Sequence, residues 1–208
     1  MKKIFIALIA LLTSFIGVSQ MNGVTATGDE VVLYGDGTWE YLVDSLNISD
    51  IKKNDTPFIR NKKSTFLVKS DKTNIGVYIN PKKWSFTKAE KDSPAEITFN
   101  IKSKDLNGML IAEKIEIPIE NLIEIAFTNA KSVAPDTRVI LKEYRNVNGL
   151  EVVAMVMGGT IQGIKFIYYG YYYSNSSGSF QFLTYTSESM FEESKKDMEE
   201  LLNGIVDR

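Results

Sequence analysis

The sequence predicts an α+β fold in which an antiparallel β-sheet of six to seven strands is flanked by two amphipathic helices. Three observations predict it. First, apolar and polar residues alternate within short segments that are separated by turn residues. Second, two other segments repeat their apolar residues at helical spacing. Third, the predicted elements follow one another along the chain in the order strands, helix, four strands, helix. With 208 residues, 44% of them hydrophobic, the chain can bury a sizeable core.

Residues 1–19 have the layout of a secretory signal peptide. Two lysines precede an apolar segment over residues 4–16, and small residues follow it. We therefore expect cleavage between Ser19 and Gln20. The apolar segment is shorter than the ~20 residues that cross a bilayer, so no transmembrane anchor is expected. The predicted mature protein is exported, either to the periplasm or to the outside of a bacterial cell.

The composition excludes several kinds of function. The chain has no histidine and no cysteine, which removes thiol nucleophiles, imidazole relays and the usual zinc ligands. We therefore expect no cofactor and no metal site. The signal segment takes two lysines with it and leaves 22 basic and 26 acidic residues, a formal charge of −4. Such a balance argues against nucleic acid as a partner.

A β-hairpin is predicted within residues 20–43. Residues 31–34 and 38–42 are rich in apolar and aromatic side chains, and the Asp-Gly step in residues 35–37 favours a tight turn. The Gly-Asp-Gly-Thr-Trp stretch resembles a short motif near the N-terminus of many exported proteins of Bacteroidetes-type bacteria. Residues 44–65 are polar and lysine-rich, and they are predicted to be a linker.

The remaining residues, 66–208, are predicted to form the α+β domain. Segments with strand-like patterns lie at about 66–68, 75–79, 97–101, 109–117, 138–147, 150–157, 164–173 and 180–186, and about six to seven of them are expected to form the sheet. Asn148-Gly149 predicts a two-residue hairpin turn. Residues 152–157 are apolar at every position, which predicts a central strand covered on both faces.

Two helices are predicted in this domain. The first begins at Pro118 and ends before Pro135, and its apolar positions are Ile119, Leu122, Ile123, Ala126, Ala130 and Val133. The second follows Ser189, whose spacing to Glu192 matches a capping box. One face of this helix is expected to carry Phe191, Met198, Leu201, Leu202 and Ile205.

Over about residues 66–206 the chain resembles the PsbP/Mog1-like superfamily. The resemblance is carried by the turn Asn80-Pro81-Lys82-Lys83-Trp84, which is similar to the proline–tryptophan turn of that group, and by the order of strands and helices. The superfamily includes photosystem accessory proteins, a nuclear-transport cofactor and bacterial envelope proteins. The resemblance therefore implies binding or scaffolding, and it carries over no site residues, because the histidines of some members have no counterpart here.

The candidate binding residues are Tyr169, Tyr171, Tyr173 and Arg145. The three tyrosines share one face of a predicted strand, where their rings and hydroxyls can contact a peptide, a glycan or a protein. The alternative is that both faces of this strand are packed beneath the helices. Arg145 can hold a carboxylate, and the alternative is a solvated arginine at a strand end.

Two other patterns have simple structural explanations. The glycine-rich residues 158–163 lie between two predicted strands, so a hairpin loop is favoured over a phosphate-binding loop. The acid pair Glu199-Glu200 is expected on the solvated face of a helix. No motif brings possible catalytic groups together.

Two hypotheses for function remain. The first is an exported, non-enzymatic binding or adaptor module of the bacterial cell envelope, whose partner is a protein or a small ligand; a chaperone or immunity-type partner of another exported protein shares this chemistry. The second is a small hydrolase or lyase that uses carboxylate and tyrosine groups, which requires two inward-facing carboxyls within ~10 Å of each other.

Overall fold

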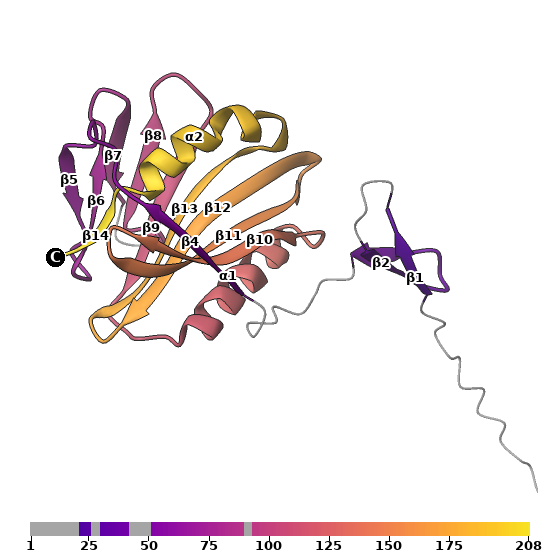
Figure 1. The fold of residues 1–208 in the computed structure, drawn as a ribbon. Coiled ribbons are helices and arrows are strands. Elements are labelled where there is room, and N and C mark those ends of the chain that lie inside the picture. Colours follow the sequence, from indigo (N-terminus) through magenta and orange to yellow (C-terminus); the bar gives the residue numbers. More distant parts are fainter. Residues whose placement is uncertain (1–20, 26–29, 42–50, 90–92) are drawn as a thin grey trace, which may run out of the picture. The chain divides into compact units, whose positions relative to one another are not determined.

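The computed structural model describes residues 21–25, 30–41, 51–89 and 93–208 (Figure 1). The predicted signal peptide and the predicted cleavage position between Ser19 and Gln20 lie outside the described residues. Contacts between residues divide the chain into two units, Met1–Leu42 and Val43–Arg208.

The first unit contains a small antiparallel sheet. Its strands are β1 (Met21–Val24), β2 (Glu30–Leu33) and β3 (Trp39–Tyr41), in the order β1-β2-β3. The predicted hairpin corresponds to β2 and β3, and Asp36 fixes its turn by accepting hydrogen bonds from the backbone and the hydroxyl of Thr38. Strand β1 was not predicted because it is short and lacks an alternating apolar pattern.

The second unit contains a main sheet of eight strands in the order β4-β10-β11-β12-β13-β9-β8-β7 (Figure 1). The strands are β4 (Lys52–Phe58), β7 (Trp84–Lys88), β8 (Ile97–Ile101), β9 (Asn107–Glu113), β10 (Arg138–Val147), β11 (Leu150–Ile161), β12 (Ile164–Asn175) and β13 (Gly178–Ser187). The predicted number of six to seven strands is therefore too low. All neighbours in this sheet are antiparallel except β4 and β10, which run parallel.

Strand β4 lies within residues 44–65, which the sequence assigns to a linker. It is an edge strand, and it runs along β10 from Lys52 opposite Glu143 to Phe58 opposite Val147. Most of its side chains are exposed, so its sequence has no buried face to reveal it. Its Pro57 is also tolerated because an edge strand need not donate a hydrogen bond from every residue.

A second sheet has three strands in the order β14-β6-β5. These are β5 (Phe66–Lys69), β6 (Ile75–Ile79) and β14 (Ile205–Asp207). The prediction that Ile205 belongs to the final helix is wrong, because this residue pairs with Val77 in the sheet. The helix stops just before Gly204, where a Cβ atom would lie 2.1 Å from the carbonyl oxygen of Tyr78. Only glycine lets the chain approach β6 this closely.

Helices α1 (Ile119–Val133) and α2 (Phe191–Leu202) cover opposite faces of the main sheet (Figure 1). The boundaries of α1 confirm the helix predicted between the two prolines. The capping box predicted for α2 is absent, because Ser189 lies in a short 3-10 helix (Glu188–Met190) and no side chain caps α2.

Strand β11 is covered on both faces, as its apolar sequence predicts. Val152, Ala154 and Val156 face the core beneath α2, whereas Val153 and Met155 face the core beneath α1. The Asn148-Gly149 turn that leads into β11 has positive φ at both residues, which confirms the predicted two-residue hairpin turn. The hairpin loop predicted over residues 158–163 is confined to Gln162 and Gly163, which also have positive φ.

Candidate functional site

The tyrosine-rich hairpin of β12 and β13 does not present an exposed aromatic face. Tyr169 and Tyr171 lie beneath α2 and expose 1% and 0% of their surface. Tyr173 is half-buried, and its ring contacts that of Phe180. Packing beneath a helix, the alternative interpretation of these residues, therefore describes the two central tyrosines.

Arg145 is buried in the same layer, so it is not a solvated arginine at a strand end. Its guanidinium donates hydrogen bonds to the hydroxyls of Tyr169 and Tyr171 and to the carboxylate of Glu143. The ring of Phe58, from β4, lies 4.3 Å from the guanidinium carbon. The structure thus brings the predicted residues Arg145, Tyr169 and Tyr171 together, but in the interior.

This cluster continues to helix α2. The hydroxyl of Tyr169 donates to Glu199 (3.1 Å) and that of Tyr171 donates to Asn203 (2.8 Å). Burial raises the pKa of Tyr171 to about 12, although Arg145 acts in the opposite direction. Burial likewise raises the pKa of Tyr169. Both phenols therefore stay protonated at neutral pH, and they connect α2 to the sheet instead of serving as bases.

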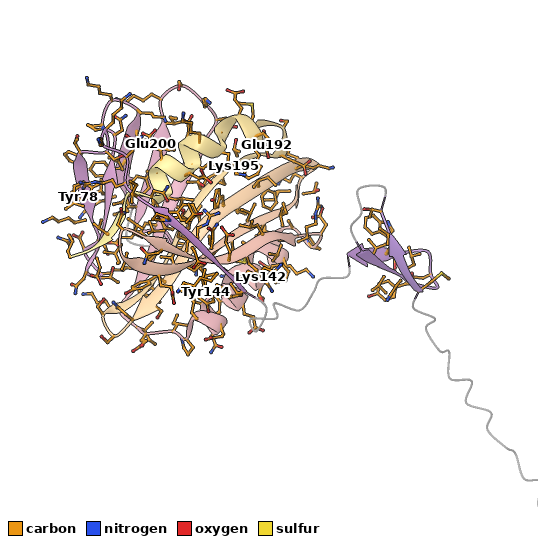
Figure 2. The ribbon with its side chains drawn as sticks, in the orientation of Figure 1. Tyr78, Lys142, Tyr144, Glu192, Lys195 and Glu200 are labelled. Carbon is orange, nitrogen blue, oxygen red and sulfur yellow. The ribbon has the colours of Figure 1, made fainter. Side chains whose placement is uncertain are left out.

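A shallow groove of about 480 Å³ lies between residues 59–63 and α2. Its charged residues are Arg60, Lys62, Lys63, Lys196, Glu199 and Glu200. Figure 2 shows Glu200 on α2 and Tyr78, whose ring lies 3.8 Å from the guanidinium carbon of Arg60. Glu200 is largely buried and accepts a hydrogen bond from Lys83 (2.9 Å), so the prediction of a solvated acid pair is wrong for this residue. One oxygen of each of the groove's two acids thus accepts from an internal partner, whereas the other oxygen of Glu200 is buried and has no hydrogen-bond partner among the described residues.

A pocket of about 150 Å³ lies on the other face of the sheet, beneath α1. Its lining comprises Met109, Ile111, Ala126, Asn129, Ala130, Val133, Met157, Ile161, Phe166, Tyr168, Tyr172, Gln181 and Leu183. The lining is apolar except for two amides and two phenols, and it contains no charged side chain. Pockets of this composition are typical of small-ligand sites.

Small residues line the pocket on its helix side. Ala126 and Ala130 occupy successive turns of the sheet-facing side of α1. On the sheet, Gly170 lies between Tyr168 and Tyr172, and a Cβ atom at this position would lie 2.3 Å from the side chain of Leu183. The glycine therefore lets Leu183, one of the lining residues, pack directly against β12.

Tyr172 is the most unusual residue of this lining. It is fully buried, and its hydroxyl has no hydrogen-bond partner among the described residues. Burial, with a smaller contribution from nearby Tyr168, raises the pKa of the Tyr172 phenol, which is therefore a neutral donor at physiological pH. Buried hydroxyls are normally paired, so this one is an exception, and it is enclosed by protein atoms and not exposed to the open space of the pocket.

Sequence reasoning did not find this pocket. Strand alternation places Tyr168 and Tyr172 on the opposite face from Tyr169 and Tyr171, but it gives no sign that one of their hydroxyls is left unpaired. The spacing of Ala126 and Ala130 on the predicted helix face was a visible signal. It became informative only once the residues opposite it were known.

Comparison with known proteins places the fold among solved structures. No family model matches the chain, and no curated protein matches it. The cyanobacterial PsbP protein CyanoP of Synechocystis aligns with a TM-score of 0.52 at 14% sequence identity, covering 71% of this chain and 95% of that chain. The fold is PsbP-like. This confirms the resemblance expected from the turn at residues 80–84 and the element order.

A second structure similar to this PsbP-like chain is PA94 of Pseudomonas aeruginosa, a protein of unknown function. It aligns with a TM-score of 0.44 at 11% identity, covering 69% of this chain and 97% of that chain. At 14% identity the likeness to CyanoP concerns the fold alone, and residue roles have to be argued from this chain itself.

No helix of residues 21–25, 30–41, 51–89 and 93–208 is both long and apolar enough to cross a membrane. Over the same part of the chain, no group of three or more acidic side chains is placed to hold a metal ion.

Proposed function

We propose that this protein is an exported, non-enzymatic binding module of the bacterial cell envelope, and that the pocket beneath α1 is its binding site. The observation that carries the proposal is the pocket itself, whose lining is mostly apolar and carries no charged side chain. Its rim includes Val133, which is 61% exposed, so a ligand can reach it from solvent.

Binding is favoured over catalysis by the chemistry of the lining. The pocket contains no carboxylate, amine, guanidinium or aliphatic hydroxyl. Its only titratable groups are Tyr168 and Tyr172, and burial raises the pKa of both phenols away from neutrality. The hydrolase or lyase hypothesis requires two carboxyls that face one cavity, and this cavity has none. Export is supported by the signal-peptide pattern of residues 1–19.

Export is tested by expressing the full chain in a bacterium and fractionating the cells. We expect the protein in the periplasm or the medium, with a mass that corresponds to a chain beginning at Gln20. Cytoplasmic protein that retains residues 1–19 would contradict the proposal.

Binding is tested with the protein purified from its native envelope without detergent. Mass spectrometry of an organic extract should find a compound that is retained by the natural protein and recovered chemically unchanged. Ala130→Phe fills the pocket and should abolish retention. The control is Thr128→Phe, which adds the same ring at an exposed position of α1 and should retain the compound. Equal retention by both variants, or conversion of the compound, would contradict the proposal.

A further inference from the structure

Many lysines of the second unit pair with acids. Those with a carboxylate partner include Lys53, Lys72, Lys83, Lys88, Lys104 and Lys165. Another group of exposed cations forms no ion pair with any residue that the structure describes, although its members line neighbouring hollows of the surface. We call this group the basic cluster, and it comprises Arg60, Lys62, Lys63, Lys82 and Lys196.

The basic cluster lines two adjoining hollows. The first is the groove between residues 59–63 and α2, which contains all of these cations except Lys82. The second has a volume of about 510 Å³ and is lined by Lys63, Thr65, Asn80, Pro81 and Lys82. Because Lys63 lines both, the two hollows meet at this residue.

The acids of the groove do not neutralise the basic cluster. Glu200 is paired with Lys83, which lines neither hollow, and Glu199 accepts a hydrogen bond from the phenol of Tyr169. The second hollow has no acidic residue in its lining. Like charges that lack counter-charges repel one another, so the cluster weakens the folded state unless an anionic partner binds there.

The positions of these cations favour an extended ligand. They come from three segments, namely residues 60–63, the turn after β6 that contains Lys82, and helix α2. A compact anion such as phosphate reaches only one part of this surface, whereas an extended polypeptide can follow both hollows. Its successive side chains point to opposite sides, so neighbouring acidic residues can approach Lys62 on one side and Lys196 on the other.

Other residues of the groove suit a polypeptide. The side-chain nitrogens of Asn61 and Asn203 donate no hydrogen bond to the described residues, so they are available to peptide carbonyl oxygens. Ile59 is 73% exposed and offers an apolar contact to a side chain. A flat bilayer surface, by contrast, touches the rim of a groove and leaves its interior uncovered.

We propose that the basic cluster is a docking site for an acidic segment of another polypeptide, which lies extended between residues 59–63 and α2 and continues past Lys63 to Lys82. Carboxylates of this segment pair with the cations of the cluster. The site lies on the α2 side of the main sheet and the pocket beneath α1 lies on the other side, so the two proposals are independent.

The test measures the binding of a labelled acidic peptide to the mature protein by fluorescence anisotropy. The peptide is a run of Asp and Glu with about ten residues, which spans about 33 Å when extended. A second peptide carries Asn and Gln in their place. The acidic peptide should bind saturably and at least about tenfold more tightly than the amide peptide, and added salt should weaken its binding. Equal affinities for the two peptides would overturn the proposal.

Side-chain amide signals in ¹⁵N spectra locate the binding site. The acidic peptide should shift the signals of Asn61 and Asn203, which line the groove. It should leave the signal of Asn129, which lines the pocket beneath α1, unchanged. A peptide that shifts Asn129 and neither of the other two binds elsewhere, and the docking site is then wrong.

Three double variants separate the cluster from the overall charge. Lys62→Glu/Lys196→Glu reverses two charges of the cluster and should abolish binding, whereas Lys62→Arg/Lys196→Arg keeps the charges and should bind like the natural protein. The matched control is Lys102→Glu/Lys114→Glu, which changes the net charge equally at exposed lysines outside both hollows. It should lower the affinity by less than about threefold. Equal losses in the two Glu variants would show that net charge alone attracts the peptide.

Two further probes represent other anionic partners, namely tripolyphosphate and vesicles of phosphatidylglycerol. If either shifts Asn61 and Asn203 while the acidic peptide does not, the cluster recognises phosphate groups and the proposal fails. Ala130→Phe, which fills the pocket beneath α1, should leave peptide binding unchanged. Failure of the docking site therefore leaves the pocket untouched, and failure of the pocket leaves the docking site untouched.

Discussion

The guanidinium of Arg145 donates a hydrogen bond to the hydroxyl of Tyr171, 3.3 Å away, in the interior between the main sheet and helix α2. The same guanidinium is covered by Phe58 of the edge strand. Tyr171 in turn donates a hydrogen bond from its hydroxyl to the side chain of Asn203, which lies just beyond α2. Arg145 therefore joins the edge strand, two central strands and a helix, and we expect its role to be structural.

Replacing Arg145 should test this role. Arg145→Met removes the charge and the hydrogen bonds that Arg145 donates to Glu143 and to two tyrosine hydroxyls, and it leaves Glu143 with Asn54 as a donor. We expect the free energy of unfolding, measured by urea titration, to fall by about 3–5 kcal/mol, as is typical when one partner of a buried ion pair is removed. Lys53→Met breaks an exposed ion pair with Glu151 and should cost less than about 1 kcal/mol. A similar small loss for both variants would show that the buried cluster contributes little.

The buried tyrosines should make the protein sensitive to alkaline pH. The pKa of Tyr171 is raised from 10.0 to about 12, chiefly by burial. Above pH 10 the unfolded chain loses this proton and the folded chain keeps it, so stability is complete below pH 10 and is lost as pH rises toward 12. The contribution of Tyr171 to this loss should be about 2–3 kcal/mol.

Urea unfolding at a series of pH values measures this loss. Tyr171→Phe cannot ionise, so its stability should decline less steeply between pH 10 and 12 than that of the natural protein. Parallel pH profiles for the two proteins would contradict the assignment.

The true beginning of the second unit can be tested with two fragments. A fragment of residues 51–208 keeps β4, and a fragment of residues 66–208 begins where the sequence alone places the domain. The shorter one lacks Phe58, which covers Arg145, and the backbone hydrogen bonds of β4 to β10. We expect it to be less stable by at least about 2 kcal/mol in thermal or urea unfolding. Equal stability would restore the linker interpretation for residues 52–58.

Gly204 should not tolerate a side chain. A Cβ atom there would lie 2.1 Å from a backbone oxygen of Tyr78, so β14 has to move away from β6. Gly204→Ala should lower stability by about 1–3 kcal/mol. Ser176→Ala, in an exposed turn, should have no measurable effect. Hydrogen exchange at Val77 should also accelerate in the Gly204 variant, and unchanged exchange would show that the strand adapts without strain.

The sequence was informative wherever a local pattern decides the structure. We predicted three such features: the helical spacing of the apolar residues in α1, the limits of this helix at the two prolines, and the two-residue turn at Asn148-Gly149. Each depends on residues that are close in the sequence. Strand β4 was missed because a polar edge strand has no apolar alternation.

The candidate site required tertiary information. Alternation showed that Tyr169 and Tyr171 share a face, but the covering of that face depends on α2, which comes later in the chain. The pocket beneath α1 is lined by residues of α1 and of the four strands β9, β11, β12 and β13, and such an arrangement across layers leaves no mark in any one segment alone.

The pairing of β14 with β6 bears on the biosynthesis of this protein. A ribosome delivers β5 and β6 long before residues 205–207, so the smaller sheet stays unfinished until translation has reached Asp207. Completion of the native structure is thereby delayed relative to chain elongation. For the export proposed above, such a delay would favour passage of the nascent polypeptide through a translocation channel in an unfolded state.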